Sequence, residues 1–315
     1  MISVRLATLQ DAAAITAIHT SDVPSWSRIG ADGIARPVDY ADLSIFERWQ
    51  HGGPWMSIET CAVHLNRLLA GSGIPLVAVH DGEVLAEAEV YENFEAPPFG
   101  HHLEIAIIAT HARHHRQGLG TALVEYTCQM ARLMKCERVT VSDAAVRGFY
   151  EKMGFQQTHT GRGVRFTPQA GRVFYQATPL TDRNPAQVKG WYMPFGRFRG
   201  SRQEWDRLFP QDWAAGLPEI LNRPAEHVKL NISGGQQAIL FVTEPEMPDY
   251  QLGDMHLTCW SGRPFTPTLY AAIRDWAFRQ GYRGLVSYVM DSELPTMGPD
   301  LHPTQYTQVF FERAV

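Results

Sequence analysis

The stretch that decides the fold is Leu103–Thr121, which reads LEIAIIATHARHHRQGLGT. Its first eight residues are rich in isoleucine and other apolar side chains, a composition typical of a strand. A glycine-rich turn, Gln117-Gly118-Leu119-Gly120, follows, and the apolar periodicity predicts an amphipathic helix from Thr121 to about Lys135. A strand, a glycine loop and a helix in this order indicate an anion site. The glycines let the backbone approach closely, and the first N–H groups of the helix point at the anion.

Two common phosphate-binding loops are disfavoured by the residues around the glycines. No Lys-Ser/Thr pair follows them, so a nucleoside-triphosphate loop is not expected. Gly120 is followed by Thr121-Ala122-Leu123, which lacks the third glycine of a dinucleotide fingerprint. The glycine loop alone is therefore a weak signal, because such a loop can also simply turn the chain.

A second motif, Ser142–Phe155, reads SDAAVRGFYEKMGF and lies downstream of the predicted helix. The two segments together resemble the GNAT superfamily of acyl-CoA-dependent N-acyltransferases. The family's loop, Arg/Gln-x-x-Gly-x-Gly/Ala, matches residues 115–120, with His115 in place of Arg or Gln. The second motif resembles the more specific Asn-x-x-Ala-x-x-x-Tyr-x-Lys-x-Gly-Phe signature, with Asp143 in place of Asn. The resemblance covers roughly residues 1–180.

The resemblance implies an α+β fold with α/β/α layers, in which a mixed, mostly antiparallel sheet is flanked by helices. It also implies acetyl-CoA as co-substrate. Backbone N–H groups of Ile108 and Thr110 would hydrogen-bond the pantetheine arm and the thioester oxygen, at the point where the family's strand splays open. The coenzyme-binding residues implied in this way are Ile108, Thr110, His115, Arg116, Gln117, Gly118, Leu119, Gly120, Thr121 and Asp143.

Acetyl transfer to an amine needs a base, because an amine with a pKa near 10 is mostly protonated at pH 7. Histone-type members of the family carry a glutamate at the place of Glu104, which makes Glu104 the first candidate. Alternate residues of the preceding strand, among them Glu87, Glu89 and Glu92, are rivals. Tyr150 matches the family tyrosine that protonates the departing thiolate. A core tyrosine and a half-exposed strand glutamate are the structural alternatives.

In the first half, the sequence predicts a strand over Ile2–Leu6 and a helix through His19, followed by a loop over Ser21–Asp39. Asp81-Gly82 predicts a tight hairpin. The segments Val164–Phe166 and Val173–Ala177 are expected to form a closing hairpin.

The second half repeats part of the pattern 146 residues later, where Pro267–Gln280 reads as a helix and Leu285–Val289 as a strand. Pro264 falls where Gly118 stood, and a proline has no N–H to offer a phosphate. We therefore expect two GNAT-like domains: a catalytic, acetyl-CoA-binding domain over 1–180 and a degenerate one over 185–315. The degenerate domain would serve the acceptor site or the structure. An unrelated α+β domain remains the alternative for the second half.

Composition narrows the possible partners. Lys and Arg number 28 against 33 Asp and Glu, a net charge of −5, so nucleic acid and anionic membranes are not expected partners. The four cysteines show neither CxxC spacing nor a secreted framework, which predicts free thiols and a cytoplasmic location. Five histidines lie within residues 101–115, yet we expect no metal, because a zinc site needs convergent ligands.

The function expected from these features is direct transfer of an acetyl group from acetyl-CoA to a primary amine in a ternary complex, because no cysteine is placed as an acyl carrier. The acceptor would be a small molecule or a peptide, and the sequence specifies neither its identity nor the oligomeric state. The alternative is a non-catalytic acyl-CoA-binding or regulatory module.

Overall fold

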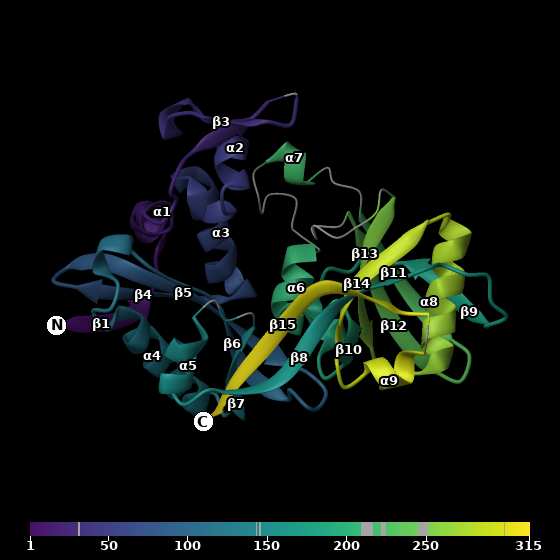
Figure 1. Ribbon diagram of the computed structural model, residues 1–315. Coiled ribbons are helices and arrows are strands. Elements are labelled where there is room, and N and C mark those ends of the chain that lie inside the picture. The colour runs from purple at the N-terminus through teal and green to yellow at the C-terminus, as the bar shows by residue number, and fades with distance from the viewer. Residues whose placement is uncertain are drawn as a thin grey trace. The chain divides into compact units, whose positions relative to one another are not determined.

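The computed structural model describes residues 1–30, 32–142, 144, 146–208, 217–221, 225–244, 251, 253–298 and 300–315 (Figure 1). The chain forms two units that interleave along the sequence. The first contains Met1–Tyr91, Ile105–Lys135 and the described part of 210–222. The second contains Glu92–Glu104 and the described parts of 136–209 and 223–315. The predicted domains, 1–180 and 185–315, divide the chain by sequence repeat and remain a prediction.

The first unit begins with a strand and a helix, as the sequence predicts. Its strands order as β1, β4, β5, and it includes the end of β6. Asp81 and Gly82 join β4 to β5 with φ angles of 51° and 86°, the left-handed geometry of the predicted tight turn. The elements are β1 (Ile2–Leu6), α1 (Ala12–Thr20), β2 (Ser27–Ile29), β3 (Ala35–Pro37), α2 (Ile45–Gln50), α3 (Ile58–Arg67), β4 (Ile74–His80), β5 (Glu83–Phe94), β6 (His101–Thr110), α4 (Leu119–Leu133) and α7 (Pro218–Leu221).

The core of the first unit joins α1 and α3 to β4. Its buried residues are Ala7, Ala12, Ile15, Cys61, Leu65 and Val77. One expectation for this unit is corrected: β2 and β3 form a short antiparallel ladder inside Ser21–Asp39, which the sequence suggested was loop throughout.

The second unit is dominated by one sheet, whose strand order is β6-β7-β15-β8-β14-β13-β12-β11-β9, with β10 beside β13. Its core packs α8 against the strands β11 to β14. The further elements are β7 (Arg138–Ser142), α5 (Arg147–Lys152), β8 (Gln156–Phe166), β9 (Tyr175–Pro179), β10 (Tyr192–Phe195), α6 (Ser201–Leu208), β11 (Ala225–Ile232), β12 (Gln236–Thr243), β13 (Asp254–Ser261), α8 (Pro267–Gln280), β14 (Gly284–Met290), α9 (Leu294–Met297) and β15 (His302–Ala314).

The order of elements repeats along the chain, as the sequence comparison of the two halves suggests. The run β4-β5-β6-α4-β7-α5-β8 in the first half returns as β11-β12-β13-α8-β14-α9-β15. In each run the strand before the long helix pairs in parallel with the strand after it: β6 with β7, and β13 with β14. The architecture is therefore α+β, built from two copies of one pattern.

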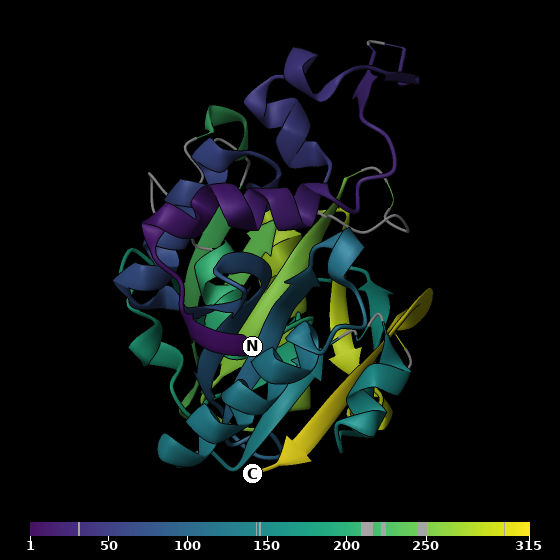
Figure 2. The ribbon, with the colours of Figure 1, turned by 90° about the vertical axis from the view of Figure 1, so that its left-hand side faces the viewer.

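The predicted closing hairpin of Val164–Phe166 with Val173–Ala177 is wrong. β8 pairs instead with β14 and with β15, and β9 pairs with β11. The C-terminal strand β15 lies between β7 and β8, and it ends with Ala314 opposite Arg138, at the C terminus marked in Figures 1 and 2. The last strand of each copy, β8 or β15, thus pairs with strands of the other copy. These pairings join residues too distant in sequence for a hairpin signal.

The described helices are short, the longest being the 15 residues of α4 and the 14 residues of α8. Among the described residues, every helix falls below the length and hydrophobicity that crossing a membrane requires.

Candidate functional site

The glycine loop lies in the first unit, at the N-terminus of α4. Gly118 is the residue before the helix, and its φ of 89° lies in the left-handed region that favours glycine. Arg116 also has a positive φ, of 61°. His115–Gly118 are exposed, and Nε2 of His115 donates to the carbonyl oxygen of Thr110 at 2.9 Å. The predicted phosphate loop therefore has the strained, open backbone that an anion site needs.

The N-terminus of α4 is left available for an anion. All of α4 is described, and no side chain of its N-cap accepts from its first N–H groups, nor does its first turn hold an acidic residue. Unpaired helix N–H groups and the helix dipole both favour a bound phosphate. An anionic group such as a phosphate fits this arrangement.

The strand β6 leads from the predicted base to this loop. Its parallel pairing with β7 joins His102–Glu104 to residues 138–140, and β6 itself continues to Thr110. Ile108 and Thr110 lie in this remaining part and are half-buried. The expected splay, which would leave backbone N–H groups for a ligand, stays a prediction.

Glu104 lies in that ladder, in the second unit, and its side chain is buried, with the residue 1% exposed. Oε1 accepts from the hydroxyl of Ser142 at 2.8 Å, and Oε2 accepts from the backbone N–H of Gly200 at 2.7 Å. Burial raises the pKa of Glu104 to about 6, while these two hydrogen bonds act to lower it. Glu104 is thus a carboxyl group tuned toward neutral pH.

Three consecutive backbone N–H groups at the start of α6 are held by side chains of β5 and β6 and the turn after β5. Gly200 donates to Glu104, Ser201 to Oε1 of Glu95 at 2.7 Å, and Arg202 to Oδ1 of Asn93 at 2.8 Å. The contact with Glu104 and the hydroxyl of Ser142 were not predicted. Residue 200 lies 96 positions from Glu104, and no local pattern connects them.

The rival glutamates each have a partner of their own. In the first unit, Nε2 of His19 donates to Oε1 of Glu87 at 2.6 Å. Glu89 accepts from Nε2 of His64 at 2.7 Å and from Nε1 of Trp55 at 2.8 Å. Burial raises the pKa of Glu87. For Glu89 burial acts in the same direction, but the hydrogen bonds and charge of His64 outweigh it and lower the pKa. Both side chains serve a buried network between β5 and the helices α1 and α3.

Tyr150 lies on α5 in the second unit, where it is 5% exposed. Its ring makes edge contacts with Phe149 and Phe155, at centroid distances of 5.0 and 5.6 Å. Burial raises the pKa of Tyr150 to about 12, so its hydroxyl is protonated at neutral pH. Asp143, the remaining predicted site residue, lies outside the described residues.

In the second copy of the pattern, both places that correspond to the predicted site are occupied: the strand before the long helix and the N-terminus of that helix. The ladder of β13 with β14 joins three residues and ends at His256. Further along β13, β10 pairs with it, and the backbone N–H of Gly196 donates to the carbonyl oxygen of Tyr288 on β14 at 2.8 Å. The hydroxyl of Thr266 caps α8 by accepting from the N–H of Leu269 at 3.1 Å. In the second copy, the chain itself therefore occupies the positions beside β13 and at the N-terminus of α8 that correspond to the predicted ligand site of the first copy.

The comparisons with known proteins agree with this geometry. Residues 37–155, which include the loop and end at the second motif, match the acetyltransferase (GNAT) family. No curated protein sequence matches the chain. Residues 37–155 therefore resemble a GNAT acetyltransferase domain, which supports acyl transfer as a general class of chemistry.

Three solved structures that match the whole chain in fold are each 10% identical to it in sequence. A GCN5-related N-acetyltransferase from Anabaena variabilis has a TM-score of 0.63, with all of this chain and 73% of that one covered. One from Kribbella flavida has a TM-score of 0.57, with coverages of 100% and 71%. A probable N-acyltransferase from Enterococcus faecalis has a TM-score of 0.58, with coverages of 100% and 72%. The likeness over the full length extends to both copies of the pattern.

Proposed function

We propose that the protein transfers an acetyl group from acetyl-CoA to a primary amine of a small molecule or peptide, by direct attack in a ternary complex. The observation that carries this proposal is the glycine loop. Gly118 has a left-handed backbone and directly precedes the uncapped N-terminus of α4, which follows the strand β6. Residues 115–121 would hold the pyrophosphate, and the N–H groups of Ile108 and Thr110 the pantetheine arm.

Bound acetyl-CoA supplies an activated thioester, and the chain supplies the proton transfers. With a pKa of about 6, Glu104 is mostly ionised at pH 7 and takes a proton from the amine, directly or through a water. Ser142 and Gly200 orient its carboxylate. Tyr150, protonated at this pH, gives a proton to the departing thiolate. The C–N bond forms as the C–S bond breaks, and the released thiol is the signal to measure.

The experiment is release of coenzyme A thiol on a panel of amines, for the wild type, Glu104→Gln and Tyr150→Phe. We expect turnover on at least one amine, with kcat/KM rising through about pH 6 in the wild type. Glu104→Gln should lose this dependence of kcat/KM on pH, and its activity should fall by about 10²-fold or more. Full activity of Glu104→Gln across the pH range would falsify the assignment of the base.

A second function is favoured by one observation, the burial of Glu104 with both oxygens hydrogen-bonded. A carboxylate so enclosed suits a non-catalytic acyl-CoA-binding or regulatory module. Binding of acetyl-CoA without thiol release on any amine would favour this alternative.

We further propose that residues 1–180 act as the catalytic domain, and that 185–315 shape the acceptor site or support the structure. Cys61, Cys136 and Cys259 are free, buried thiols, which supports a reducing, cytoplasmic location. The net charge of −5 supports an amine acceptor over nucleic acid or a membrane surface.

A further inference from the structure

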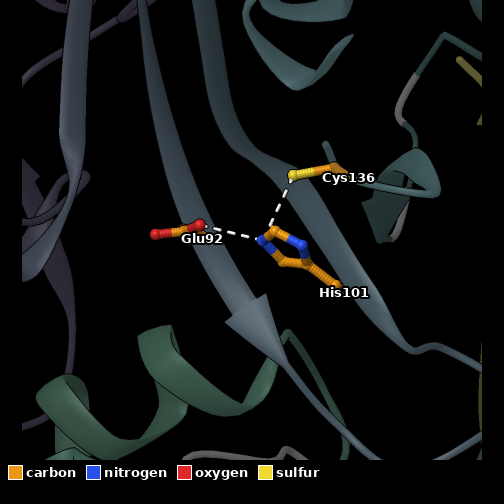
Figure 3. Close-up of side chains that lie close together, drawn as sticks. All are labelled: Glu92, His101 and Cys136. Carbon is orange, nitrogen blue, oxygen red and sulfur yellow. Dashed lines mark hydrogen bonds and ion pairs between the residues drawn. The ribbon is translucent and has the colours of Figure 1, made fainter. Parts of the chain in front are cut away.

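Three side chains with metal-binding atoms meet in the second unit, at a place the acyl-transfer chemistry does not use (Figure 3). Glu92 comes from β5, His101 begins β6, and Cys136 lies in the turn before β7. Nε2 of His101 is 2.8 Å from Oε1 of Glu92 and 3.4 Å from Sγ of Cys136. The three ligand atoms lie within 4.8 Å of one another.

We propose that Glu92, His101 and Cys136 form a zinc site with its fourth position open to water. Thiolate sulfur, imidazole nitrogen and carboxylate oxygen are the ligands that Zn²⁺ prefers, at bond lengths of about 2.0–2.3 Å. A tetrahedral ion with such bonds separates its ligand atoms by about 3.3–3.8 Å. The separation of Nε2 of His101 from Sγ of Cys136 lies in that range, whereas its separation from Oε1 of Glu92 is shorter, and all three atoms lie within 4.8 Å of one another.

Charge also favours a divalent cation at this place. Cys136 as thiolate and Glu92 as carboxylate carry two negative charges, and a neutral His101 completes a set that balances Zn²⁺. Burial and the charge of Glu92 raise the pKa of the Cys136 thiol to about 11, so a bound ion would displace its proton. A metal ion would replace two hydrogen bonds by three stronger bonds.

The site is pre-formed by the sheet and its neighbours. The His101 ring stacks on Phe94, with centroids 4.1 Å apart and planes at 9°, which fixes where Nε2 points. The backbone N–H of Glu137 donates to the carbonyl oxygen of His101 at 2.8 Å, which ties the residue after Cys136 to the start of β6. Rigid supports of this kind lower the cost of bringing ligands together.

An ion has a path from solvent. The side chains of Glu92 and His101 are 35% and 21% exposed, whereas Cys136 is buried. The exposed side leaves room for the water on the fourth position, and the buried thiol protects the zinc–sulfur bond.

The site lies at the start of β6, whereas the glycine loop follows the end of that strand. Its expected effect is to hold β5, β6 and the turn before β7 together. The proposal does not depend on the proposed function. It departs from the expectation of no metal, which considered histidines close in sequence. The ligands here come from three separate elements.

The test is a titration of the full-length, metal-free protein with Co²⁺, followed by displacement with Zn²⁺. We expect one ion per chain and a thiolate-to-cobalt charge-transfer absorption that Zn²⁺ abolishes. Cys136→Ser should lose this absorption, and Glu92→Gln and His101→Gln should weaken binding by at least about tenfold. Cys61→Ser, which changes a buried thiol on α3, and His80→Gln are matched controls and should bind as the wild type does.

Absence of the absorption in the wild type would overturn the proposal, and so would its persistence in Cys136→Ser. Far-UV circular dichroism checks that each variant is folded. If Cys136→Ser does not fold, Glu92→Gln decides the question, because its side chain is partly exposed and it keeps the size of the residue. Unchanged affinity in Glu92→Gln and His101→Gln would then reject the site.

Discussion

The backbone N–H of Gly200 donates a 2.7 Å hydrogen bond to Oε2 of Glu104. The carboxyl group predicted to act as base is therefore covered by the start of α6, in a segment from the second half of the sequence. A side chain at residue 200 would fill the same space, because a Cβ there would clash with Oε2 of Glu104 and lie 2.6 Å from Nδ2 of Asn93. The backbone of Gly200 is thus part of the environment that tunes Glu104.

Gly200→Ala should destabilise the protein by about 1–3 kcal/mol, because the added methyl group forces α6 away from Glu104 and breaks the hydrogen bond. Chemical denaturation measures this free energy of unfolding. Gly148→Ala on α5 is the control, since a Cβ there meets nothing within 4 Å. Equal stability of the two variants would show that the contact with Glu104 is unimportant.

Stability should depend on pH through Glu104. Its pKa is raised from 4.5 to about 6, so between these values the folded state binds more protons than the unfolded state. The contribution of the group is fully present below about pH 4.5 and is lost as pH rises through about 6. This difference in pKa corresponds to about 2 kcal/mol in the free energy of unfolding.

The measurement is the free energy of unfolding at pH 5 and pH 7 for the wild type and Glu104→Gln. Glutamine imitates the neutral acid, so the variant should lose less stability than the wild type over this interval. An identical pH dependence in both proteins would mean that the pKa of Glu104 is not raised.

Gly118→Ala should weaken the binding of coenzyme A by about tenfold or more. A left-handed φ is costly for alanine, and the loop must shift its N–H groups away from the phosphate position. Isothermal titration calorimetry gives the Kd. Gly82→Ala is matched in strain, because Gly82 has a φ of 86° and open space around it, but it lies in the β4–β5 hairpin. Similar losses of affinity in both variants would argue against the loop as the coenzyme site.

Each chain should bind one molecule of coenzyme A, although the structural pattern occurs twice. In the second copy β10 pairs with β13 where its ladder with β14 has ended, and Thr266 caps α8. Equilibrium dialysis with labelled acetyl-CoA measures the stoichiometry. Two bound molecules per chain, or a residual site in Gly118→Ala of undiminished affinity, would contradict this prediction.

Short-range features of the sequence predicted much of the first half. The Asp81-Gly82 turn, the strand before Gly118 and the helix after it all formed as expected, because each depends on neighbouring residues. The helix Pro267–Gln280 formed within the predicted bounds. β11 was missed although Val228, Leu230 and Ile232 alternate with Lys229 and Asn231, which is the pattern of a half-buried strand.

The sequence by itself determined the glycine loop and the helix and strand that return 146 residues later, since turn chemistry and hydrophobic periodicity act over a few residues. Only the tertiary structure decided three features. These are the pairing of β8 with β15, the hydrogen bond from Gly200 to Glu104, and the cluster of metal-binding atoms described above. The physical reason is that these contacts join residues far apart in the chain. Their geometry follows from how the strands pair, which no local pattern encodes.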